Sequence, residues 1–230
     1  MKIFVLLVSI FLSYTGIYSQ GIEIYSLNGR YKVIIEGRKD EGFIGDQLVS
    51  LFHENIKVWT KRIPAELLMY PIVSNIGEVA IPHYSYIIFY DSLGKEKHSY
   101  KLGINETIWD ETIANPIHGF SPSGDRYYVI CNNFILCLDN SVRQIWRDTM
   151  DYQCQPRTLQ FYKDKVLFSY WTTGDTISDI ICVYDRDDAR VWQHTSAQPL
   201  KILIDSTNGK LIAVDKYQSV KFDLENKNAP

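Results

Sequence analysis

An all-β fold, and within that class a β-propeller, is predicted by two features of the sequence. Five segments run from an apolar stretch through a short polar turn into a second apolar stretch, with the turns LNG, NIG, PSG, YKD and TNG. The turn residues lie 48, 47, 41 and 44 residues apart, in the order Gly29, Gly77, Gly124, Lys165 and Gly209. Repeats of about 40 to 50 residues are typical of propeller blades. Because a blade buries its faces against neighbouring blades, packing alone explains the repeat.

Each repeat supplies the strands of one blade in the same order. Second strands rich in β-branched and aromatic residues are expected at 31–36, 78–82, 126–132, 165–171 and 210–216. Near-continuous apolar third strands are expected at 48–52, 86–91, 134–139, 180–185 and 219–224. A fourth strand then carries an aromatic residue at a similar place, namely Trp59, Tyr100, Trp146 or Trp192. We expect the recurring tryptophans to pack in the core.

The fifth repeat shows no fourth strand before residue 230. A propeller commonly completes its last sheet with a strand from the other end of the chain, which removes an exposed edge. Residues 20–24 are therefore the candidate closing strand of a ring of about five four-stranded blades. The alternative is an open ring, or one completed by oligomerisation.

The N-terminus indicates export. Lys2 precedes an apolar run at 3–12, followed by small and polar residues, which is the pattern of a signal peptide. The run is too short to span a bilayer, and a buried first strand is the alternative interpretation. We expect residues 1–19 to be removed and residues 20–230 to form a single propeller domain, secreted or located in the periplasm or at the cell surface.

Composition and motifs narrow the classes of function. The formal net charge is −3, with no concentrated basic stretch, so we do not expect a nucleic-acid partner. Catalytic, metal-ligand and cofactor motifs are missing from the sequence, and we expect neither a metal ion nor a cofactor. The four cysteines are Cys131, Cys137, Cys154 and Cys182. They are interpreted either as buried thiols or as partners in disulfides, with Cys131 and Cys137 facing each other across a hairpin.

The segment FSPSG at 120–124 and the strands ending in IW or VW resemble the WD-repeat family and bacterial quinoprotein-like propellers. The resemblance covers most of the predicted mature chain and implies blade topology. It does not extend to the side-chain network of WD repeats, because Thr60, Arg147 and Gln193 follow the three tryptophans where that family has aspartate. A Gly-His pair is missing as well.

The connections divide the predicted disc into two faces. Turns between first and second strands, and between third and fourth strands, are short and share one face. Long connections at 37–47, 103–119 and 171–179 share the other face, where function tends to lie. The candidate binding residues there are Trp109, Asp110, Glu111, His118, Tyr152, Arg157, Trp171, Thr173, Asp175 and Asp179. A tryptophan beside carboxylates suits a sugar ring or a peptide, whereas Trp109 and Trp171 as caps of blade ends are the alternative.

The sequence thus predicts a secreted or periplasmic, non-catalytic binding or scaffold module that holds a protein or glycan partner on the long-connection rim. The alternative is a carbohydrate-active hydrolase that uses rim carboxylates. Its candidate groups are Asp46, Asp110, Glu111, Asp175 and Asp179.

Overall fold

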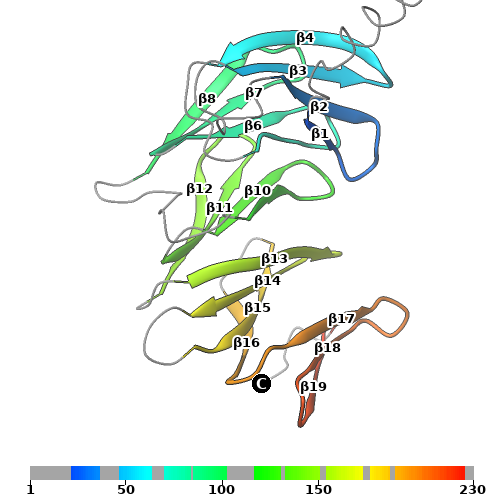
Figure 1. Cartoon of the computed structure of the whole chain (residues 1–230), viewed down its shortest axis with the longest axis vertical. Coiled ribbons are helices and arrows are strands. Elements are labelled where there is room, and N and C mark those ends of the chain that lie inside the picture. The colour runs from blue at the N-terminus through cyan, green and yellow to red at the C-terminus, as the bar shows by residue number, and fades with distance from the viewer. Residues whose placement is uncertain are drawn as a thin grey trace, which may run out of the picture.

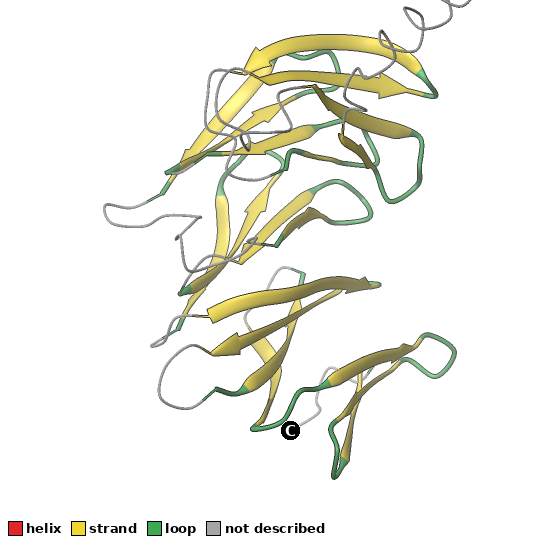
Figure 2. Ribbon diagram, in the orientation of Figure 1, coloured by secondary structure: helices red, strands yellow, loops and turns green. Residues whose placement is uncertain are grey.

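The structure, a computed structural model, consists of β-strands arranged in successive antiparallel sheets. It describes residues 22–36, 47–63, 70–83, 85–102, 117–130, 133–150, 154–172, 177–186 and 190–225. In these residues Figure 2 shows strands joined by loops and turns, without a helix. No helix in them is therefore available to cross a membrane.

Five sheets contain the strands, and each sheet is a meander in which neighbours in sequence pair antiparallel. The first contains β1 (Ile22–Tyr25), β2 (Tyr31–Glu36), β3 (Gln47–His53) and β4 (Ile56–Ile63). The second contains β5 (Ile72–Val73), β6 (Val79–Pro82), β7 (Tyr86–Tyr90) and β8 (Glu96–Lys101). The third contains β9 (His118–Phe120), β10 (Arg126–Ile130), β11 (Phe134–Asp139) and β12 (Gln144–Thr149). The fourth contains β13 (Cys154–Tyr162), β14 (Lys165–Thr172), β15 (Asp179–Asp185) and β16 (Arg190–Ser196), and the fifth contains β17 (Lys201–Asp205), β18 (Lys210–Val214) and β19 (Ser219–Asp223).

The predicted succession of blades is confirmed, with one hairpin repeat in each sheet. Figure 1 shows the sheets following one another in chain order, with the first and last at opposite ends of the molecule. First strands of neighbouring sheets contact each other, β1 with β5 and β5 with β9.

The prediction that residues 20–24 close the ring is wrong for the part that the structure describes. Ile22 and Ile24 pair with Ile35 and Val33 of β2, which makes β1 the first strand of the first sheet. The fifth sheet has three strands, β17, β18 and β19. A short turn joins β1 to β2, so β1 reaches this partner at a small cost in loop-closure entropy.

Glycines in the first turns allow neighbouring blades to approach closely. Gly77 has φ of +84°, and a Cβ at this position would lie 2.6 Å from Cε1 of Tyr31 in the first sheet. Asn75, in the same turn, links three consecutive blades: its Oδ1 accepts from the Asn28 backbone N–H at 2.8 Å, and its Nδ2 donates to the Pro122 carbonyl at 2.6 Å. The repeated turn therefore bends the chain and also holds adjacent blades together.

Four apolar clusters form the core, each between two consecutive sheets. Fourth-strand tryptophans contribute to them by packing onto the next sheet. Trp59 lies 5.9 Å from Tyr90, and Trp192 stacks on Phe222 at 4.9 Å, both measured between ring centroids. The predicted packing role of Trp59, Trp146 and Trp192 is confirmed.

The expectation that Tyr100 takes the equivalent place in the second sheet is wrong. Trp59, Trp146 and Trp192 each lie opposite a third-strand residue that borders a shift in register. In the second sheet the residue at this position is His98, opposite Phe89, and Tyr100 lies two residues further along. The β-bulge occurs at the same place in all four sheets, so strand register fixes this position, and in the second sheet the residue there is a histidine.

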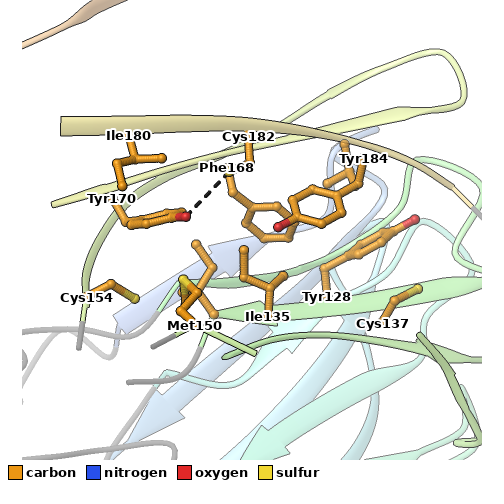
Figure 3. Close-up of a cluster of buried hydrophobic side chains, with 12 residues drawn as sticks. Tyr128, Ile135, Cys137, Met150, Cys154, Phe168, Tyr170, Ile180, Cys182 and Tyr184 are labelled. Atoms are coloured by element: carbon orange, nitrogen blue, oxygen red, sulfur yellow. Dashed lines mark hydrogen bonds between the residues drawn. The ribbon is translucent and has the colours of Figure 1, made fainter. Parts of the chain in front are cut away.

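The cluster between the third and fourth sheets contains the cysteines that the structure describes (Figure 3). Cys137, Cys154 and Cys182 are buried free thiols. Tyr170 Oη lies 3.4 Å from Cys182 Sγ. The interpretation as small buried side chains is confirmed for these three, whereas Cys131 lies outside the described residues.

Candidate functional site

Four of the predicted site residues lie in the part of the chain that the structure describes: His118, Arg157, Trp171 and Asp179. The other six, Trp109, Asp110, Glu111, Tyr152, Thr173 and Asp175, lie outside it. Arg157, Trp171 and Asp179 come together at the long-connection end of the fourth sheet. His118 belongs to the third sheet and has different partners. We call the cluster of Arg157, Trp171 and Asp179, with Leu200, the fourth-sheet rim site.

Arg157 occupies an irregular position in the repeat. The pairing of β13 with β14 shifts in register between Pro156 and Thr158, so Arg157 is the additional residue of a β-bulge. In the described residues the other four sheets pair their first and second strands without such a shift. A bulge changes the direction of a side chain. Here it lets Arg157 reach across to Asp179 on β15.

Asp179 organises the rim site. It begins β15, lies opposite Trp171 of β14, and has only 1% of its side chain exposed. Its Oδ2 accepts hydrogen bonds from Arg157 Nη1 and, at 2.7 Å, from the Leu200 backbone N–H. Arg157 Nη1 also donates to the Leu200 carbonyl at 3.5 Å. Because Leu200 directly precedes β17, this ion pair ties the fourth sheet to the chain entering the fifth.

Trp171 holds the guanidinium group from a second direction. The Arg157 Cζ atom lies 4.8 Å from the centre of the Trp171 ring, within the range of a cation–π interaction. Trp171 is 37% exposed and the Arg157 side chain 28% exposed. The Asp179 Oδ1 atom is buried and has no hydrogen-bond partner among the described residues. The site therefore presents a fixed cation beside an accessible indole ring.

His118 is held in a neutral state by its surroundings. Its Nδ1 lies 2.9 Å from Tyr127 Oη, and its Nε2 lies 2.9 Å from the Tyr70 carbonyl. The carbonyl can only accept, so Nε2 carries the proton and Nδ1 accepts from the tyrosine. Burial lowers the pKa of His118 to about 4, against the raising effect of the Tyr70 hydrogen bond. With both nitrogens engaged, His118 has no vacant position for a ligand or for proton transfer.

His118 also lines a cavity of about 220 Å³ that we call the axial cavity. The first strands and turns of four sheets form its walls. Apolar side chains dominate the lining, including Ile24, Leu27, Ile72, Ile117, Leu159 and Phe161. Sequence reasoning missed this cavity because its residues come from four separate repeats. The one signal for this cavity in the sequence was the apolar character of each first strand.

The described residues contain no group of three or more His, Cys, Asp or Glu side chains arranged to hold a metal ion. The hydrolase hypothesis requires a pair of available carboxylates on the rim. Of its candidates, the structure describes Asp179 alone, which is buried and engaged with Arg157. Asp179 as placed is therefore poorly suited to act as an acid or nucleophile.

Comparison with known proteins identifies the fold. One solved structure, described as that of a eukaryotic initiation factor, superposes with a TM-score of 0.52 over 87% of this chain and 50% of its own, at 9% identity. The fold is a WD40-like β-propeller. A structure of the mitotic checkpoint complex gives a TM-score of 0.48 at 11% identity, covering 85% of this chain and 59% of its own.

These similarities concern the propeller fold alone. The chain spans about half of the first of these structures and about three fifths of the second. No family model matches the sequence. No curated protein matches it either.

Proposed function

We propose that this propeller is an exported, non-catalytic binding module that holds a protein partner on the fourth-sheet rim site. The observation that carries the proposal is the contact of Arg157 with both Asp179 and Trp171. Tryptophan and arginine are the residues that contribute most often to binding energy at protein interfaces. Their fixed positions lower the entropy that would be lost when a partner orders them.

A protein partner suits the rim site better than a glycan. Arg157 lies over one face of the Trp171 ring, which reduces the indole surface on which a sugar ring could stack. The remaining exposed surface combines an indole with guanidinium donors, which suits a polypeptide with both apolar and polar groups. Ile177, in the same β14–β15 hairpin, is 67% exposed and adds apolar surface.

Export is the second part of the proposal and rests on the sequence. Lys2 and the apolar run at 3–12 form the pattern of a cleaved signal peptide. Expression of the full chain in a secreting host, followed by intact-mass measurement of the exported product, tests it. We expect loss of residues 1–19; a product that retains Met1 contradicts the export proposal.

Selection from a display library of random linear peptides tests the binding function. We expect the folded chain to select peptides whose binding is weakened by W171A and by R157Q. Y217A is a matched control, because Tyr217 is 76% exposed and lies in the β18–β19 connection of the next sheet. R143Q is a second control, since Arg143 is 78% exposed and lies in a short turn. Peptides that bind both rim variants as tightly as the wild type contradict the proposed site.

A further inference from the structure

The unused hydrogen-bonding capacity of Arg157 indicates what the rim site recognises. A guanidinium group carries five N–H donors in a fixed planar fork. The contacts that the structure describes use Nη1 alone, toward Asp179 Oδ2 and the Leu200 carbonyl. Nε and Nη2 have no hydrogen-bond partner among the described residues, and part of the side chain is exposed. The group is therefore fixed in place with donors to spare.

Among the residues that the structure describes at the rim site, the charge favours an anion over a cation. Asp179 balances the charge of Arg157, but its side chain is 1% exposed and does not face a partner. What a partner meets is the guanidinium group. Lys201, the exposed residue that follows Leu200, is the positively charged first residue of β17. An approaching carboxylate is attracted, whereas a lysine or arginine side chain is repelled.

Trp171 favours a partner that carries an apolar side chain next to its anionic group. Its indole is partly exposed and packs against the guanidinium group, so an apolar side chain beside the carboxylate gains contact area there. The planar fork of an arginine matches the two oxygens of a carboxylate. A dianionic phosphate gains less, because Asp179 already takes up part of the charge of Arg157.

We propose that the fourth-sheet rim site recognises a partner segment in which a carboxylate stands beside an aliphatic or aromatic side chain. Arg157 binds the carboxylate and Trp171 packs against the apolar neighbour. The inference rests on the proposed function and names the chemistry of its partner. The carboxylate belongs either to an Asp or Glu side chain or to the end of a polypeptide, and the experiment separates the two sources.

The test measures binding of the folded chain to synthetic peptides in one neutral host sequence. The set contains Glu-Leu, Gln-Leu, Glu-Gly and phosphoserine-Leu pairs at an internal position, and a C-terminal Leu with a free or amidated carboxylate. We expect Glu-Leu or the free C-terminal Leu to bind best, and each amide counterpart to bind about tenfold more weakly or worse, as for the loss of a charged hydrogen bond. A higher salt concentration is expected to weaken the binding of the carboxylate peptides and not that of the amide peptides.

Variants assign the effect to the named residues. In R157Q the preference for carboxylate over amide peptides is expected to disappear. In R157K this preference is expected to decrease but not to disappear, because lysine keeps the positive charge and lacks the planar set of donors of a guanidinium group. W171A is expected to remove the preference for Glu-Leu over Glu-Gly. Y217A is expected to bind as the wild type does. Thermal unfolding of each variant verifies that it is folded, and W171F replaces W171A if that variant unfolds.

Each contrary outcome has one meaning. If carboxylate and amide peptides bind equally well and W171A abolishes the binding of both, the carboxylate inference is overturned. The rim site is then still supported as the binding site. Binding that neither R157Q nor W171A affects overturns the rim site itself. Tighter binding of the phosphoserine peptide, or no binding by any peptide in the set, also overturns the carboxylate inference.

Discussion

The indole of Trp146 in the third sheet stacks on the ring of Tyr184 in the fourth, with ring centroids 4.9 Å apart and planes inclined by 8°. Tyr184 belongs to the cluster in Figure 3, and Trp146 packs against that cluster. Tyr128 lies 6.0 Å from Trp146, and Phe168 lies 5.6 Å from Tyr184, both measured between ring centroids. The same relation between a fourth strand and the following sheet recurs at Trp59 and Trp192. Consecutive blades are therefore joined through aromatic pairs.

Replacing Trp146 by alanine should destabilise the protein strongly. Removal of a large aromatic side chain from a packed site costs about 3 kcal/mol or more. We expect a lower denaturant midpoint for W146A with an unchanged slope. L93A is the control, because Leu93 is 81% exposed in a turn. An unfolding midpoint that W146A does not shift contradicts the role of the stack.

Asn75 should stabilise the contacts between neighbouring blades. Its side chain accepts from Asn28 and donates to Pro122, which lie 47 residues before and after it. Each hydrogen bond contributes about 0.5 to 1.5 kcal/mol net, so N75A is expected to lower the free energy of unfolding by about 1 to 2 kcal/mol. N140A is the control, since no described hydrogen bond involves the Asn140 side chain. Equal stability of N75A and the wild type removes the proposed link.

Arg157 and Asp179 should be coupled in stability. Leaving one member of a buried ion pair without its partner costs about 3 kcal/mol or more. We expect D179N and R157Q each to lower the free energy of unfolding, with the double variant less destabilised than the two effects added together. Chemical denaturation of all four proteins gives the coupling energy. Strict additivity contradicts the ion pair.

Stability should fall in mild acid, partly through His118. Its pKa is about 4 in the folded protein and near the ordinary histidine value of 6.5 when unfolded. The unfolded chain therefore binds more protons between these values, and the contribution of His118, complete above 6.5, is lost as the pH falls toward 4. Burial also lowers the pKa of His83, which acts in the same direction.

Comparison with H118Q isolates the contribution of His118. We expect the variant to lose less stability than the wild type when the pH falls from 6.5 to about 4.5, as measured by denaturation at each pH. The carboxyl groups of Asp125 and Asp139, whose pKa values hydrogen bonds and nearby arginines lower from 3.8, act mainly below this window. Identical pH dependence in the two proteins contradicts the neutral state of His118.

Several features of the rim site were visible in the sequence, and others were not. Trp171 and Asp179 flank a long connection between two apolar strands, which marked them as candidates. Their contact with Arg157 was not predictable, because it depends on a bulge after Pro156 and on the position of Leu200 in the next repeat. The remaining predicted residues lie outside the part of the chain that the structure describes, so they stay predictions.

The sequence by itself determined the hairpins, their order and the packing role of the tryptophans. Turn residues and alternation of apolar side chains act over a few residues, so they can be recognised without a structure. Only the tertiary structure decided that residues 22–24 belong to the first sheet and not to the last, that His98 takes the place expected for Tyr100, and that Arg157 contacts both Asp179 and Trp171. These relations depend on strand register and on contacts between repeats, where a shift of one residue reverses the face to which a side chain points.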